Sequence, residues 1–205
     1  MKQVRLFILL VVFTGALGLQ VSAIGGEQTK GSPYLTGELL VATPKLSDPN
    51  FSKTVVLMVE HDADGAFGLI VNRLIGTGPL KDLVMGLGFE SATAEGDISL
   101  RFGGPVERGQ AFVVHGSDYE VADTVKVGSG LSVTNQSRII TDMATGNGPA
   151  QRMIVLGYAG WGAGQLDREI ARGDWFSMAA DKALVFSPDI DTIWERARAR
   201  AGLAL

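Results

Sequence analysis

The hydrophobic positions of this chain fall into short runs, and most of these runs predict β-strands. The runs 54–59 and 66–71 are almost continuously apolar, and Glu60 and the polar, glycine-containing segment 61–65 separate them. Such runs are typical of strands covered on both faces, and a five-residue turn between two strands predicts an antiparallel pair. Further predicted strands cover 36–42, 98–102, 110–115, 131–133, 153–156, 174–176 and 183–186.

Helical spacing and helix-end signals predict a smaller number of short helices. Pro79 is suited to open a helix, and Thr134 or Asn135 is suited to cap one. The predicted helices cover 80–87, 135–144, 166–171 and the segment from 187 onward. Strands therefore dominate, and their order with the helices is irregular. This predicts an α+β fold with a mostly antiparallel, strongly twisted sheet flanked by short helices.

The N-terminal segment has the three-part pattern of a secretory signal peptide. Lys2 and Arg5 precede an apolar run over 6–19, and small residues at Val21 and Ala23 suit a signal peptidase. We predict a signal peptide over 1–23, a polar tether over 24–33 and one domain over 34–205. The apolar run is shorter than the roughly 20 residues that span a bilayer. We therefore expect no stable membrane span, although an uncleaved anchor is the alternative.

Composition excludes several classes of site. The chain has no cysteine, which rules out disulfides, thiolate metal sites, a cysteine nucleophile and a lipidated cysteine anchor. The net charge is −4, and without Lys2 and Arg5 it is −6, from 16 basic and 22 acidic residues. Because binding to nucleic acid depends on clustered Lys and Arg, we expect no nucleic-acid partner.

A glycine-rich block at 157–164 is the most distinctive segment of the chain. Four positions within 157–170 are glycine, and aromatic residues stand between them at Tyr158 and Trp161. This density predicts a constrained loop that leads from a strand into a helix. The block does not fit a phosphate-binding loop, because it lacks the Lys-Ser/Thr pair and a full GxGxxG.

Together with other blocks, this segment resembles the bacterial YqgE/AlgH family. The supporting blocks are 35–42, 48–51, 60–61, 65–73, 103–106, the strand ending at His115, 157–170 and 174–175. The resemblance implies an α+β fold with a partly barrel-like sheet, and a family whose members mostly lack an assigned activity. Leu74 stands where relatives often carry proline, and Asp167 where they often carry glutamate. Relatives also lack the N-terminal segment, so the alternatives to a periplasmic or secreted protein are a mis-assigned start and a cytoplasmic location.

Polar residues at strand ends form one candidate site. Glu60, His61, Asn72, Arg73 and His115 all lie where predicted strands end, and a shared cleft would offer an acid–base group and an anion-binding group. The alternative is that these residues stabilise turns and loops, because neighbouring antiparallel strands end at opposite edges of a sheet. With only two distant histidines, no metal site or other cofactor is expected.

The glycine block offers a second candidate site, a binding surface. Its members are Trp161, Tyr158, Gly162, Gly164 and Gln165. The alternative is a tight turn that the two aromatic side chains hold in place.

Two functions remain open from the sequence. The first is a non-enzymatic binding or regulatory domain, exported from the cytoplasm, with a protein or small-molecule partner and an undetermined oligomeric state. The AlgH name implies regulation, sometimes supposed transcriptional, but no helix-turn-helix or basic stripe is visible. The second is an enzyme of unknown, hydrolase-like reaction that uses His61 or His115.

Overall fold

The computed structural model describes residues 34–88 and 93–201, so the predicted signal peptide and tether lie outside the described residues. Its strands are β1 (Glu38–Ala42), β2 (Val55–His61), β3 (Gly65–Ile70), β4 (Leu74–Pro79), β5 (Asp97–Phe102), β6 (Val106–Gly116), β7 (Val125–Gly128), β8 (Leu131–Thr134), β9 (Arg152–Gly162) and β10 (Trp175–Ala179). Its helices are α1 (Leu80–Gly86), α2 (Ser137–Ala144), α3 (Gln165–Ala171), α4 (Lys182–Val185), the 3₁₀ helix η1 (Ile190–Thr192) and α5 (Ile193–Arg200).

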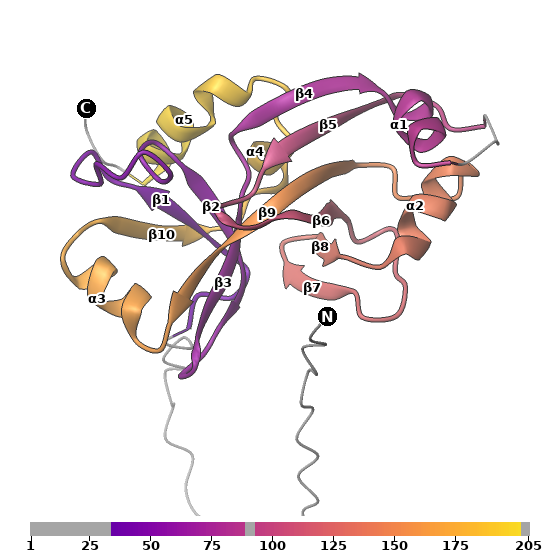
Figure 1. Cartoon of the computed structure of the whole chain (residues 1–205). Coiled ribbons are helices and arrows are strands. Elements are labelled where there is room, and N and C mark those ends of the chain that lie inside the picture. Colours follow the sequence, from indigo (N-terminus) through magenta and orange to yellow (C-terminus); the bar gives the residue numbers. More distant parts are fainter. Residues whose placement is uncertain (1–33, 89–92, 202–205) are drawn as a thin grey trace, which may run out of the picture. The chain divides into compact units, whose positions relative to one another are not determined.

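The ten strands form one sheet in the order β10-β1-β2-β3-β9-β6-β8-β7, with β5 also paired to β9 and β4 paired to β5 (Figure 1). The pair of β5 with β9 is parallel, and every other pair is antiparallel. The sheet does not close on itself. An α+β fold with a mostly antiparallel sheet and short helices is therefore confirmed.

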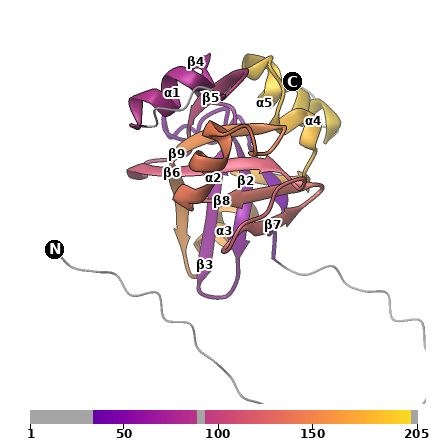
Figure 2. The same cartoon turned by 90° about the vertical axis from the view of Figure 1, so that its right-hand side faces the viewer.

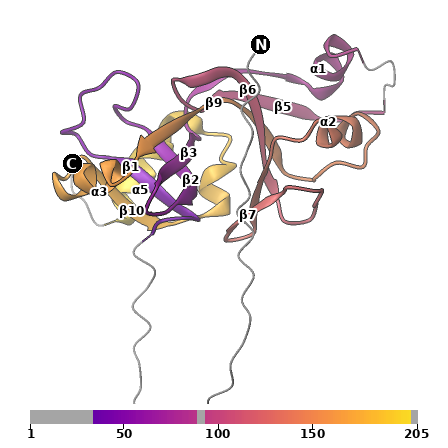
Figure 3. The same ribbon diagram turned by 60° about the horizontal axis from the view of Figure 1, so that its bottom comes forward.

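Strand β9 joins the two halves of the sheet. Its first half pairs with β5 and β6, and its last residues pair with β3. Figure 3 shows β1, β2, β10 and α3 to one side of β9, and α1, α2 and β7 to the other. The glycine block is consequently strand up to residue 162, and the prediction that it is a loop is wrong for most of its length.

Glycine is required where β9 passes the loop between β5 and β6. Gly157 has φ +70°, and a Cβ there would lie 2.6 Å from the carbonyl oxygen of Gly104. A Cβ on Gly104 would lie 2.1 Å from the carbonyl carbon of Tyr158. Two backbones therefore meet at this crossing with no room for side chains. The left-handed conformation of Gly157 also shifts the alternation of side chains between the two faces of β9. As a result Val155 and Tyr158, three residues apart, both pack against the same core.

Buried side chains form three clusters on the described part of the sheet. The first is enclosed by the curled sheet and covered by α4 and α5. The second lies on the outer face of β1–β3 and the end of β9, under α3. The third lies between the other half of the sheet and helices α1 and α2; Figure 2 shows α2 in front of β6 and β9.

Three local predictions differ from the structure. Residues 183–186 were predicted as a strand, but 182–185 form α4, because the Asp181 carboxylate accepts hydrogen bonds from the backbone N–H groups of Ala183 and Leu184. Helix α2 begins after Gln136 without a side-chain cap, so neither predicted cap residue serves it. Strands β4 and β7 were not predicted at all.

Candidate functional site

The five residues of the predicted glycine-block surface do not share one surface. Trp161 is only 6% exposed and belongs to the second cluster, whereas Tyr158 packs against the aromatic rings of Phe67 and Phe112 beside the first. Gly162 and Gln165 are exposed, and Gly164 is partly buried at the start of α3. A binding surface in this region would therefore present 162–165 to a partner, and not the Trp161 indole.

The indole of Trp161 belongs to a polar cluster centred on Glu169. One carboxylate oxygen, Oε2, accepts hydrogen bonds from Trp161 Nε1 at 3.0 Å and from Trp175 Nε1 at 2.9 Å. The other oxygen accepts from Gln165 Nε2 at 2.9 Å, and the Gln165 amide oxygen accepts from the Gly162 N–H at 3.2 Å. This cluster fixes α3 against β9 and β10. Its role in the structure is to anchor α3, and sequence analysis missed Glu169 although it stands four residues after Gln165.

The residues of the predicted cleft separate into three places. Glu60 is exposed at the end of β2, and His61 beside it is buried. His61 Nδ1 accepts a hydrogen bond from the Leu35 N–H at 3.2 Å, and its Nε2 lies 3.8 Å from Asp167 Oδ1. Asp167, one of the two departures from the family pattern, is thus the acidic neighbour of this histidine.

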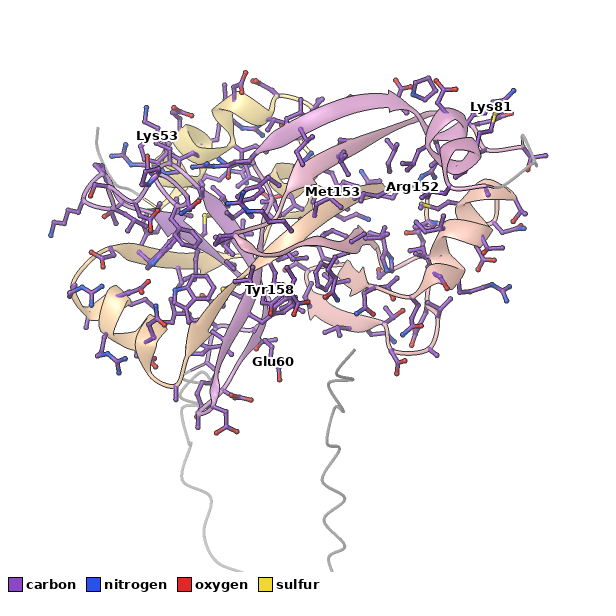
Figure 4. All side chains as sticks on the ribbon, in the orientation of Figure 1. Lys53, Glu60, Lys81, Arg152, Met153 and Tyr158 are labelled. Atoms are coloured by element: carbon purple, nitrogen blue, oxygen red, sulfur yellow. The ribbon has the colours of Figure 1, made fainter. Side chains whose placement is uncertain are left out.

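Asn72 and Arg73 serve a loop at the other end of β2. The Asn72 side chain accepts from the Val55 N–H and donates to the Lys53 carbonyl, and the Arg73 guanidinium donates to the carbonyls of Pro49 and Ser52. Figure 4 labels Lys53 and Glu60 at opposite ends of β2. Neither Asn72 nor Arg73 contacts either histidine, so the structure brings Glu60 and His61 together but not the whole predicted cleft.

His115 lies in a third place, on the face of β6 that α2 covers. Its side chain is fully buried, and Nδ1 is 2.8 Å from the Gly116 carbonyl oxygen. The register places His115 directly opposite Ser132 on β8 and opposite Arg152 on β9. Burial lowers the pKa of His115, because the charged imidazolium is poorly solvated there. Sequence analysis found His115 but not its two neighbours.

A hydrogen-bonded group from α2 and the loop after β6 covers His115. The Tyr119 ring packs edge-on at 5.6 Å from the imidazole, and its hydroxyl donates to Asp142 at 2.7 Å. Arg138 donates to the other oxygen of Asp142 at 2.8 Å. Burial and the Asp142 carboxylate raise the pKa of Tyr119 to about 12. The phenol therefore stays protonated and keeps its hydrogen bond at neutral pH.

A hollow of about 330 Å³ opens beside Arg152, which Figure 4 labels next to α2. Its lining is Thr93, Glu95, Met143, Gly146, Gly148 and Arg152. The Arg152 guanidinium donates to the carbonyls of Pro149 at 2.7 Å and Glu95 at 2.9 Å. Burial lowers its pKa. The hollow is polar and small. Because Arg152 is paired with His115 across β9 and β6, its side chain connects the hollow to the surroundings of His115.

The exposed apolar side chains gather on the segment 74–87. Leu74 and Ile75 on β4 are 49% and 54% exposed, and Met85 and Leu87 around the end of α1 are 52% and 57% exposed. Strand β4 pairs only with β5, so its other edge has no strand partner in the described chain. Gly76 and Gly78 on this strand face open space. Sequence analysis missed this edge, although it singled out Leu74.

No group of three or more His, Asp or Glu side chains is placed to hold a metal ion among residues 34–88 and 93–201. In the same ranges no helix is long and apolar enough to cross a membrane.

Sequence comparisons relate the chain to known proteins. The domain family DUF179, described as AlgH-like, matches residues 39–205. A UPF0301 protein of Methylococcus capsulatus is 46% identical over 179 residues, which cover 87% of this chain and 98% of the relative. A UPF0301 protein of Rhodospirillum rubrum is 39% identical over 174 residues, covering 85% and 91%.

Structure comparisons agree with this result. The solution structure of the AlgH protein from Pseudomonas aeruginosa matches with a TM-score of 0.68 and 34% identity, over 85% of this chain and 93% of that one. A crystal structure of a Corynebacterium diphtheriae protein matches with a TM-score of 0.65 over 81% and 86% of the two chains. At 22% identity, the second match shows a shared fold only.

Proposed function

The chain belongs to the AlgH-like family, and from this premise we propose that it is a non-enzymatic binding domain that recognises an extended segment of another protein along strand β4. The observation that carries the proposal is the unpaired edge of β4. A free edge offers a row of backbone N–H and C=O groups, and proteins with no use for such an edge protect it with charges or cover it. Residues 74–79 contain no charged side chain, and Leu74 and Ile75 are about half exposed.

The composition of β4 supports recognition of a strand over recognition of a small molecule. A segment added beside β4 would gain main-chain hydrogen bonds and would cover Leu74 and Ile75, which is the physics of β-strand addition. Gly76 and Gly78 have no positive φ, and a Cβ on either would meet nothing within 4 Å. The chain's own packing therefore does not require glycine at these positions, and no side chain at either position stands over the strand.

Site-specific photo-crosslinking in the native bacterium tests this proposal. We expect a photoreactive phenylalanine analogue at position 75 to give one defined protein adduct. The matched control is position 125 on β7, where the valine is 43% exposed on a strand at another edge of the sheet. The adduct should also be lost when Leu74→Lys is added. An identical adduct pattern at both positions, or no adduct at either, would refute strand recognition at β4.

We also propose that the domain works outside the cytoplasm, on the strength of the signal-peptide pattern over 1–23. Mass spectrometry of the native protein from fractionated cells tests this. A mature N-terminus at Ile24 in the periplasmic or secreted fraction would support export. A protein that retains Met1, or begins near Tyr34, in the cytoplasmic fraction would overturn it and direct the search for partners of β4 to the cytoplasm.

A further inference from the structure

Three buried polar atoms without a protein hydrogen-bond partner lie in one row across neighbouring strands. They are Ser132 Oγ on β8, His115 Nε2 on β6 and Arg152 Nε on β9. The described residues hold five such atoms, so most of them belong to this row. His115 is paired directly with Ser132 on one side and with Arg152 on the other. Directly opposed side chains share a face, with Cβ atoms about 5 Å apart.

The row lies under α2. Val113 precedes His115 by two residues, so both point to the same face of β6. Val113 packs in the third cluster with Ile139 and Met143 of α2. Ser132 is 1% exposed and His115 is 0% exposed, so bulk solvent does not reach either side chain directly. At the other end of the row, Arg152 lines the hollow beside α2.

The hydrogen-bonding capacity of each atom follows from its neighbours. His115 Nδ1 is 2.8 Å from the Gly116 carbonyl, which accepts only, so Nδ1 carries the proton. In the neutral ring Nε2 is then an acceptor. Arg152 Nε carries one hydrogen and is a donor only, whereas the Ser132 hydroxyl both donates and accepts. A ligand in this row must therefore donate to His115 and accept from Ser132 or Arg152.

Buried polar atoms are almost always satisfied by protein or by ordered water. Water offers two donors and two acceptors, and buried water in proteins typically makes about three hydrogen bonds with otherwise unpaired groups. We infer that the row Ser132–His115–Arg152 is a binding site for ordered water, which donates to His115 Nε2, accepts from Ser132 Oγ, and reaches the row from the hollow past Arg152.

Nitrogen NMR of the histidine ring tests the inference on the unmodified protein. An unprotonated ring nitrogen that accepts a hydrogen bond resonates upfield of one that accepts none, so we expect His115 Nε2 at the upfield position. We also expect magnetisation transfer from water to the His115 ring. The Ser132→Ala variant identifies the donor. The upfield shift persists if water donates to Nε2, and it is lost if the Ser132 hydroxyl donates directly.

Stability measurements provide an independent readout with a matched control. Thr134 is buried on the same strand, and its hydroxyl already has a protein partner, Thr124 Oγ1, at 3.1 Å. We expect Ser132→Ala to lower the urea midpoint of unfolding, as Thr134→Val does, because both remove a satisfied hydroxyl. A Ser132→Ala midpoint equal to or above that of the unmodified protein, or a His115 Nε2 resonance at the unbonded position, would overturn the inference.

Discussion

The carboxylate of Glu169 holds two buried tryptophans, and its removal should destabilise the domain strongly. In Glu169→Ala the Nε1–H groups of Trp161 and Trp175 lose a shared acceptor, Oε2, at 3.0 and 2.9 Å. Trp161 and Trp175 are 6% and 3% exposed, so water replaces that acceptor poorly. A hydrogen bond to a charged group contributes about 1.5–3 kcal/mol. Because Glu169 itself is partly exposed, we expect a loss of about 2–4 kcal/mol in the free energy of unfolding.

Urea unfolding followed by circular dichroism measures this loss. With a slope of about 2 kcal/mol per molar urea, the expected midpoint shift is about 1–2 M. Glu169→Gln should cost less than Glu169→Ala, since its amide oxygen still accepts from both indoles, but its amide nitrogen then faces the donor of Gln165. The double variant Gln165→Glu, Glu169→Gln turns that contact back into a donor–acceptor pair and should recover stability. A Glu169→Ala loss below about 0.5 kcal/mol, or a double variant no more stable than Glu169→Gln, would refute this account.

Three further predictions follow from the packing and the pKa shifts. Gly104→Ala should destabilise the domain by more than about 2 kcal/mol because its Cβ would overlap the backbone of β9, whereas Gly162→Ala should stay within about 0.5 kcal/mol because nothing lies within 4 Å; thermal unfolding of both compares them. Arg101 is 3% exposed, one of its terminal guanidinium nitrogens donates to the backbone carbonyls of Val71 and Val185, and burial lowers its pKa to about 10. Arg101→Lys keeps the charge, but its side chain is one bond shorter and its ammonium falls short of these carbonyls, so urea unfolding should show a loss of about 2 kcal/mol. Folding lowers the pKa of His115 from its ordinary value of 6.5, so below pH 6.5 the unfolded chain binds more protons than the folded one. The contribution of His115 to the free energy of unfolding should therefore be constant above pH 6.5 and fall as the pH drops below it. If His115→Gln shows a fall of equal size, other groups cause the pH dependence.

The sequence predicted the elements whose signals are local. The apolar runs of β2 and β3 and the turn between them led to the correct antiparallel pair, and Pro79 marked the start of α1 correctly. The run 183–186 has only four residues, too few to distinguish a strand from a buried helical turn by periodicity. Asp181 was the available signal, since an acid two residues before such a run suits a helix cap.

The candidate sites depended on register, which sequence spacing does not supply. Ser132, His115 and Arg152 become neighbours only because β8, β6 and β9 pair in one register. A shift of one residue would turn any of these side chains to the other face. Strand β4 was missed because its two glycines and Pro79 are typical of a loop, and only its pairing with β5 makes it a strand.

The position of β9 in the chain has a consequence for folding while the chain emerges, whether from the ribosome or from an export channel. Its partners β3, β5 and β6 are all translated earlier, and β9 begins only at Arg152. While the first 150 residues emerge, β1–β3 and β6–β8 are able to form local antiparallel pairs. The edges of β3, β5 and β6 that pair with β9 stay unpaired until β9 has emerged. Exposed edges of this kind favour association with other chains. The emerging chain is therefore most vulnerable to aggregation just before β9 appears, and a chain truncated in that interval would keep those edges permanently open.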